Sequence, residues 1–344
     1  GGFGPDADQD IIKCGSYTGT GSSQLTVNLG WEPQWLLVKR TDNSNDWILF
    51  DTMRGFGASG NYAYWLEPNT SDQEAQAIAD WLELTSTGFS STSTQTRVNG
   101  NGATYIYMAI RAPMITPPEA GTDVFALDNF NAGGESKAPT ARSGFPVDMA
   151  YYKAITGTAT AVGSRLTQAR VINANSNGAE GAEASIMFDY MNGYYKEASA
   201  FPSYYVAMWK RAKGYFDVVC YDGTGSARTV AHSLGVSPEM MWVRRRNTSG
   251  NWYTYHSGAN STAPEDFFLE MNEDGAPIND ARAWNDTTPT ASVFSVGTAN
   301  ETNGNGDSFI AYLFATLAGI SKVGSVSHSG SSTDVDCGFS NGAR

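Results

Sequence analysis

The sequence predicts an all-β protein built from tandem, jelly-roll-like β-sandwich modules, each of about a hundred residues, with short helical insertions. Three observations lead to this prediction. The composition is rich in turn formers and aromatics, with 37 Gly, 17 Tyr and 9 Trp, while only 17% of residues are charged. Short stretches of alternating apolar and polar residues recur between clusters of Gly, Asn and Ser. The order of these stretches then repeats along the 344 residues.

Two distant segments share their motifs at matching spacing. YTGTGSSQLTVNLGWEPQWLLVKR at 17–40 corresponds to YDGTGSARTVAHSLGVSPEMMWVRRR at 221–246. Trp47 and Trp252 follow these stretches at equivalent positions, so both are expected in the core. NGNG closes both segments, at 99–102 and at 303–306. Shared spacing over such a length indicates a repeated structural unit.

Within the first repeat, the predicted strands are QLTVNL, WLLVKR and YIYMAI, at 24–29, 35–40 and 105–110. The Tyr-x-Gly-x-Gly element is a turn, where glycine permits positive φ. One helix is predicted, SDQEAQAIADWLEL at 71–84, with Ser71 as its cap and Glu74 completing a capping box. The basic strand ends KRT (39–41) and RRR (244–246) are expected on a solvated edge.

A third, divergent copy is expected between these repeats. SGFPVDMAYYKA (143–154) keeps the spacing from Gly to Lys, and IMFDYMNGY (186–194) is similar to ILFDTMRGF (48–56). This alignment makes 154–185 an insertion. A fourth copy begins after Ile320 and stops at Arg344.

The predicted division is an N-terminal arm at 1–13, module 1 at 14–114, a divergent module 2 at 115–212, module 3 at 213–319, and the start of a truncated fourth module at 320–344. Almost no linker separates the modules, so a stiff string of packed domains is expected.

Charge and cysteine usage exclude several classes of function. A net charge of −13 argues against a nucleic-acid partner, because phosphate binding needs clustered Lys and Arg. No twenty-residue apolar run is present, so no membrane insertion is expected. Cys14, Cys220 and Cys337 form neither a disulfide framework nor a CxxC zinc motif. Buried free thiols, made in a reducing compartment, are the simpler interpretation, and no cofactor or metal is expected.

The titratable residues form no recognisable catalytic motif. No nucleophile elbow accompanies the histidines His232, His256 and His328, so no catalytic residue is predicted. Asp6, Asp8 and Asp10 have the alternate spacing of a calcium loop, but the glycine and the final glutamate of that loop are missing. An acidic surface arm is favoured there, and calcium binding stays open.

An aromatic cluster is the candidate binding site. NYAYWLEPN at 61–69 places Tyr62, Tyr64 and Trp65 in a Gly- and Asn-flanked loop, where flat amphipathic rings can stack on a sugar or a partner surface. The alternative, which we favour for Trp65, is that its indole plugs the open end of the sandwich.

The combination YTGTG…V.LG..P.WLLVKRT……DW…DT.RG, then W……NGNG…Y.A and AGISKVGS, resembles an uncharacterised repeat domain. That domain occurs in bacteriophage virion proteins, often tail-fibre or tail-associated proteins of marine phages. The resemblance covers 14–114 and 213–344 well and 143–212 poorly. It implies a non-enzymatic virion component, made in the reducing cytoplasm of a bacterial host, and it carries no catalytic residues over to this chain.

The expected function is therefore structural and adhesive, as part of a phage tail fibre or spike that attaches to the host. The expected partners are other virion proteins, further copies of the chain in a homo-oligomer (a trimer by analogy), and a host surface glycan or protein receptor. One alternative is a capsid decoration or head fibre. Others are a glycan-binding lectin and a glycan-degrading depolymerase, whose carboxylates would break the repeat symmetry, as Glu180, Asp189 and Glu197 do.

Overall fold

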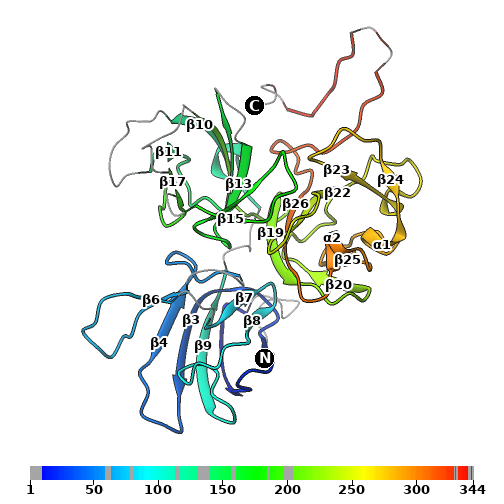
Figure 1. Ribbon diagram of the computed structural model, residues 1–344. Coiled ribbons are helices and arrows are strands. Elements are labelled where there is room, and N and C mark those ends of the chain that lie inside the picture. Colours follow the sequence, from blue (N-terminus) through cyan, green and yellow to red (C-terminus); the bar gives the residue numbers. More distant parts are fainter. Residues whose placement is uncertain are drawn as a thin grey trace.

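The computed structural model describes residues 10–58, 63–77, 81–112, 117–130, 139–155, 160–183, 186–196, 204–328, 330, 332–339 and 342. These residues form an all-β protein of antiparallel sheets, as predicted, grouped into three β-sandwich modules (Figure 1). The helices in this part of the chain are single turns: η1 (Gly121–Asp123), η2 (Pro264–Asp266), α1 (Ala281–Trp284) and α2 (Asn300–Asn303).

Module 1 comprises β1 (Ile12–Thr18), β2 (Leu25–Asn28), β3 (Pro33–Arg40), β4 (Ile48–Asp51), β5 (Ala63–Trp65), β6 (Ala75–Ala77), β7 (Glu83–Thr85), β8 (Gly88–Ser91) and β9 (Thr104–Arg111). Module 2 comprises β10 (Phe125–Phe130), β11 (Ala141–Arg142), β12 (Met149–Ala154), β13 (Thr160–Ser164), β14 (Arg170–Asn173), β15 (Gly181–Ala182), β16 (Ile186–Met187), β17 (Gly193–Lys196) and β18 (Tyr204–Trp209). Module 3 comprises β19 (Phe216–Asp222), β20 (Arg228–Ala231), β21 (Met240–Arg245), β22 (Tyr253–His256), β23 (Phe267–Glu270), β24 (Ile278–Asn279), β25 (Val293–Val296) and β26 (Ser308–Phe314).

The three modules share one topology. The large sheets have the orders β1-β9-β3-β4, β10-β18-β12-β13-β14-β15 and β19-β26-β21-β22-β23-β24. Each begins with the first strand of its module, then the last strand, then the two strands of the central hairpin. A small sheet covers one face of each large sheet, made of β2-β8-β7, β11-β17-β16 and β20-β25. Module 2 therefore keeps the architecture of its neighbours although its sequence has diverged.

Each module has a central hairpin: β3 and β4, β12 and β13, or β21 and β22. The same backbone hydrogen bond occurs at the open end of all three hairpins and fixes the alignment of the modules. The backbone N–H groups that follow β4, β13 and β22 donate to carbonyl groups at the start of the partner strands: Thr52 to Gln34, Arg165 to Asp148 and Ser257 to Glu239. Asp51, Ser164 and His256 are consequently equivalent positions.

The repeated motifs hold one another together. Asn99 and Asn303, from the two NGNG motifs, are fully buried. Their side-chain oxygens accept from the backbone N–H groups of Thr20 and Thr224, at 2.7 and 2.9 Å, in the Tyr-x-Gly-x-Gly turns. A Cβ atom on Gly19 would lie 2.2 Å from a backbone oxygen of the facing motif, so close approach requires glycine there.

The modules pack directly on one another, as expected, but in a closed arrangement in which each contacts the other two and not as a string (Figure 1). Modules 1 and 2 are joined by a backbone hydrogen bond from Ala58 N to Leu166 O, at 2.9 Å. Strand β7 of module 1 lies against β19 of module 3. Modules 2 and 3 meet where the Trp252 Nε1 donates to Asn173 O, at 2.9 Å.

Hydrophobic packing continues across these junctions. Modules 2 and 3 each have an internal core between their sheets. A third apolar cluster joins the core of module 1 to the outer faces of the other large sheets, including Met149 and Val162 of module 2 and Val218 and Tyr312 of module 3. The closed arrangement is therefore stabilised by apolar burial as well as by hydrogen bonds.

Two predictions about local structure are wrong. The segment 71–84 forms no helix in its described part, since it contains β6 and the start of β7. Its apolar residues pack on the sandwich instead, with Trp81 stacked on Trp65 at 3.9 Å between ring centroids. The segment 186–194 is not equivalent to 48–56, because β16 and β17 belong to the small sheet while β4 belongs to the large one. The segment 154–185 is therefore no insertion: it carries β13–β15.

Three burial predictions also differ from the structure. Trp252 is buried because it enters the junction with module 2, whereas Trp47 is only half-buried. Arg244 and Arg246 are buried at the same junction, not solvated. Of the three thiols, Cys220 is buried, Cys337 is half-buried and Cys14 is exposed.

Candidate ligand-binding cleft

A cleft of about 800 Å³ lies between modules 1 and 2. Module 1 contributes the end of the β3–β4 hairpin and its neighbours: Gln34, Trp35, Asp51, Thr52, Met53, Arg54, Tyr64, Glu74 and Ile110. Module 2 contributes Gln168, Ala169, Ile186, Met187 and Asp189. Aromatic, apolar, amide and charged groups thus face one space, which is the usual make-up of a ligand site.

The turn that follows β4 forms one wall and is held by its own ion pair. The Asp51 carboxylate accepts from the backbone N–H of Arg54 at 2.9 Å, and its second oxygen lies 2.7 Å from the Arg54 Nη2. Gly55 then turns the chain with φ of 111°. A Cβ atom there would lie 3.1 Å from the Tyr64 ring and 3.4 Å from the Gln168 side chain, so glycine lets both side chains approach the turn.

Gln168 forms the facing wall in a left-handed backbone conformation, with φ of 49°. Its side-chain Nε2 donates to the carbonyl oxygens of Arg165 at 2.8 Å and Thr52 at 3.3 Å, so it bridges the two modules. Non-glycine residues adopt this conformation at a cost in energy, and such residues cluster at functional sites.

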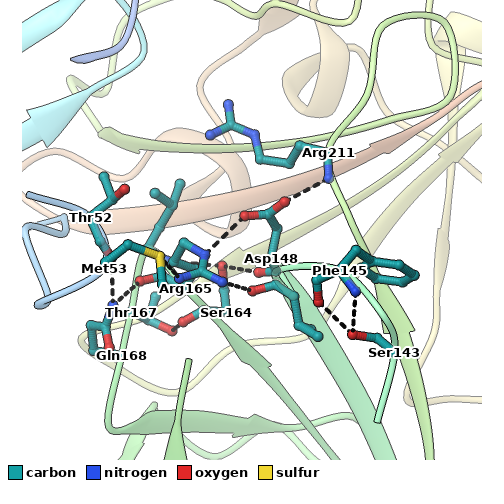
Figure 2. A network of polar contacts seen from close by, with 12 residues as sticks. Thr52, Met53, Ser143, Phe145, Asp148, Ser164, Arg165, Thr167, Gln168 and Arg211 are labelled. Atoms are coloured by element: carbon teal, nitrogen blue, oxygen red, sulfur yellow. Dashed lines mark hydrogen bonds and ion pairs between the residues drawn. The ribbon is translucent and has the colours of Figure 1, made fainter. Parts of the chain in front are cut away.

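Arg165 belongs to a polar network next to the cleft and contacts Met53, one of the cleft residues (Figure 2). Its side chain is buried, and its three guanidinium nitrogens donate to the Asp148 carboxylate at 3.1 Å, the Val147 carbonyl oxygen at 2.7 Å and the Met53 sulfur at 3.0 Å. The other Asp148 oxygen accepts from the backbone N–H of Arg211 at 2.7 Å. The cleft wall is therefore tied to the junction of all three modules.

At that junction Arg211 neutralises two buried carboxylates. It donates to both oxygens of Glu32, at 2.5 and 3.0 Å, and to Asp217 at 2.8 Å. All three side chains are at most 9% exposed. Glu32 belongs to module 1 and Asp217 to module 3, so this network fixes the modules relative to one another.

The predicted aromatic cluster is only partly brought together. Tyr62 lies outside the described residues. Tyr64 is half-buried and lines the cleft. Trp65 points into module 1, where it is 6% exposed, stacks on Trp81, and donates from Nε1 to Glu67 at 3.2 Å. The Trp65 side chain thus packs in the sandwich.

The histidines lie away from the cleft. Burial lowers the pKa of His232, whose Nδ1 accepts from the Leu234 N–H and whose Nε2 lies 3.2 Å from the Thr290 carbonyl oxygen. A carbonyl oxygen only accepts, so the ring is neutral with its proton on Nε2. His256 is half-buried and His328 is exposed.

The remaining carboxylate candidates have different environments. Asp189 lines the cleft, whereas Glu180 is buried in an ion pair with Arg246 at 2.8 Å. Glu197, Asp6 and Asp8 lie outside the described residues. Within the described part of the chain, no group of three or more His, Cys, Asp and Glu residues is placed to hold a metal ion.

Sequence reasoning missed most of the cleft, because its two walls come from different modules. Trp35, Arg54 and Gln168 looked like ordinary strand-end and turn residues. The similarity of ILFDTMRGF (48–56) to IMFDYMNGY (186–194) predicts an alignment of the modules and does not indicate a shared site. The structure places these segments on opposite walls, with Met53 on one and Met187 on the other.

Comparison with known families supports the division seen in the fold. The model of the family described as Domain of unknown function (DUF7483) matches residues 9–113 and 208–341, about two thirds of the chain. The chain belongs to the DUF7483 family. Each matched segment contains one complete DUF7483 sandwich, module 1 or module 3, whereas module 2 lies between the matches. The cleft thus joins a DUF7483 module to a module that the family model does not match.

A search of curated proteins finds no match to the chain. No helix among the residues that the structure places is long and apolar enough to span a membrane.

Proposed function

We propose that this protein is a non-enzymatic structural component of a phage virion, acting in host attachment as part of a tail fibre or spike, and that it binds a surface glycan in the cleft between modules 1 and 2. The virion role rests on the resemblance of the repeated motifs to repeat domains of phage virion proteins. The glycan role rests on the cleft.

One observation carries the glycan proposal: Trp35 and Tyr64 line the same cleft as the side-chain amides of Gln34 and Gln168. A sugar ring has apolar C–H faces and a polar rim, so aromatic side chains and amides recognise its two parts. Arg54 and Glu74 add charged groups, whose Nε and Oε2 atoms are 3.9 Å apart, beyond hydrogen-bonding distance. Their remaining donors and acceptors suit hydroxyl or acidic substituents.

The cleft is better suited to binding than to hydrolysis. A glycosidase needs a general acid held in apolar surroundings and a second carboxylate at a set distance. The Asp51 carboxylate forms an ion pair with the Arg54 side chain. Glu74 and Asp189 are exposed to solvent, so neither is held in apolar surroundings. Rigid walls with exposed polar groups fit a reversible attachment site, where many weak contacts act together.

Binding of the purified chain to immobilised host-surface polysaccharides tests the proposal. The wild type should bind one polysaccharide reversibly, and Gln34→Ala should weaken that binding, whereas Gln24→Ala, which lies outside this cleft, should not. Equal binding by both variants would remove the cleft from the proposal. If the wild type binds none of the host polysaccharides, the proposed attachment function is contradicted.

The depolymerase alternative draws support from Asp51 and Asp189, which reach one cleft from different modules. Incubation of the bound polysaccharide with the protein distinguishes the two functions. A fall in viscosity with release of new reducing ends, abolished by Asp189→Asn, would replace the attachment proposal with hydrolysis.

Immunogold labelling of intact virions tests the virion role. Label on thin tail appendages is expected. Label over the icosahedral shell would instead support a capsid decoration or head fibre, and unlabelled virions would contradict both locations.

A further inference from the structure

Most of the charged groups that line the cleft between modules 1 and 2 are carboxylates. Asp51 and Glu74 belong to the wall from module 1, and Asp189 belongs to the wall from module 2. Arg54 is the one cation among the described lining residues. A cleft lined mainly by one sign of charge concentrates ligands of the opposite sign. The formal charges of the lining therefore favour a ligand with positive charge.

The charge of Arg54 is already offset within its own wall. Its Nη2 atom lies 2.7 Å from the Asp51 carboxylate, and its Nε atom lies 3.9 Å from a carboxylate oxygen of Glu74. Arg54 can still donate to an acidic substituent, but that substituent would then lie beside both carboxylates. The chain as a whole, with a net charge of −13, also repels acidic polymers. A ligand rich in acid groups is thus disfavoured.

Asp189 supplies an unpaired carboxylate on the opposite wall. Its side chain is exposed and lines the cleft. It forms no ion pair with any other residue that the structure describes. A carboxylate accepts hydrogen bonds with both oxygens, and hydrogen bonds from an ammonium group are among the strong ones. Asp189 is therefore available to bind an ammonium group that enters the cleft.

Aromatic rings in the same cleft suit the same kind of group. Trp35 and Tyr64 line the wall from module 1, and both are half-buried. The face of an aromatic ring attracts a cation, and this attraction grows where solvent is partly excluded. Carboxylates and aromatic rings therefore favour a cationic ligand through two different interactions.

We propose that the glycan bound in this cleft carries free amino groups, as a sugar polymer with unacetylated amino sugars does. Asp189 and Glu74 bind its ammonium groups, while the side-chain amides of Gln34 and Gln168 bind its hydroxyl groups. A Lys-rich peptide also offers ammonium groups, but it lacks the hydroxyl rim that the two amides suit. This inference rests on the proposed glycan function and names the class of the ligand.

Two oligosaccharides of equal length test the inference: a glucosamine hexamer with free amino groups and its fully N-acetylated form. Acetylation removes the positive charges and keeps the sugar rings and their hydroxyl groups. In titration calorimetry, the full chain is expected to bind the free-amine hexamer about tenfold more tightly than the acetylated one at low salt. Sodium chloride at about 0.5 M should reduce this preference, because salt screens the attraction between charges.

Asp189→Asn should weaken binding of the free-amine hexamer about fivefold, since Glu74 and the aromatic rings remain. Binding of the acetylated hexamer should not change. Asp274→Asn is the matched control, because it alters the net charge equally at an exposed site of module 3 outside the cleft. This control should bind both hexamers like the wild type, and an equal loss in the two variants would reduce the effect of Asp189 to overall charge and contradict its role.

The outcomes separate this inference from the function on which it rests. Equal or tighter binding of the acetylated hexamer, lost in Gln34→Ala, would overturn the amino-sugar inference and keep the glycan function. Hexalysine that binds as tightly as the free-amine hexamer would assign the cleft to a Lys-rich peptide and overturn both. If neither hexamer binds, the amino-sugar inference is wrong, and the assay with host polysaccharides decides the glycan function separately.

Discussion

Two guanidinium nitrogens of Arg211 donate hydrogen bonds to the carboxylate of Glu32, at 2.5 and 3.0 Å, although the two residues are 179 positions apart in the sequence. Neither side chain is more than 9% exposed. Removal of one partner from a buried ion pair leaves an uncompensated charge in the interior, which costs far more than loss of a surface pair. The closed arrangement of the modules therefore depends on this contact.

Arg211→Met should lower the free energy of unfolding by about 3–5 kcal/mol, because it leaves the buried carboxylates of Glu32 and Asp217 without a compensating positive charge. Glu32→Gln should cost less, since Arg211 keeps Asp217 as its partner. Urea denaturation measures both values. Arg282→Met is the control: its pair with Asp280 is solvent-exposed, so its removal should change the stability little. Equal costs for Arg211→Met and Arg282→Met would contradict a structural role for the network.

Trp65→Ala should destabilise module 1 by about 3–5 kcal/mol, the usual cost of removing a buried tryptophan. Trp65 is 6% exposed and stacked on Trp81, whereas Trp47 is only half-buried, so Trp47→Ala should cost less. Chemical denaturation of the two variants gives the comparison. A Trp65→Ala protein of unchanged stability that no longer binds glycan would instead make Trp65 a ligand contact.

Tyr64→Ala should weaken glycan binding about tenfold, which corresponds to the loss of about 1.4 kcal/mol of aromatic contact. Tyr64 lines the cleft with its side chain half-buried, so the fold should persist. Titration calorimetry with the bound polysaccharide measures the effect. Tyr205→Ala, an exposed aromatic outside the cleft, should bind like the wild type, and an equal loss in both variants would point to nonspecific adsorption.

The melting temperature should fall as the pH drops below about 6.5, partly because of His232. Burial lowers the pKa of this imidazole in the folded state, so the unfolded chain takes up the proton first and acid favours unfolding. His232→Gln should make the fall between pH 7.5 and pH 5.5 less steep. It should not abolish the fall, since partial burial also lowers the pKa of His256. His328→Gln, at an exposed site, should follow the wild-type curve.

The fold class could be predicted from the sequence because each module carries its own local signals. Tyr-x-Gly-x-Gly and NGNG are recognisable as repeated turns, and the structure places them against each other through Asn99 and Asn303. The helix expected at 71–84 failed for a physical reason. A capping box stabilises a helix only weakly, and the stacking of Trp81 on Trp65 outweighs it.

Relations between modules could not be predicted from local patterns. The basic run at 244–246 has the composition of a solvated strand end, yet Arg246 is buried against Glu180 of the neighbouring module. The cleft illustrates the same limit: the aromatic neighbours of Tyr64 in the sequence indicate a binding residue, but Gln168 approaches it only because modules 1 and 2 pack together. Contacts between distant segments leave no periodicity in either segment.

The pairing of first and last strands has a mechanical consequence. In module 1, Ile12 at the start of β1 lies opposite Ile110 near the end of β9, so the chain enters and leaves at one corner of the sandwich. Tension applied to the chain ends would open this pair like a zipper, a few hydrogen bonds at a time, since the strands are antiparallel and are pulled from the same end. In the virion appendage proposed above, these strand pairs would separate first under load unless the contacts between modules carry the force.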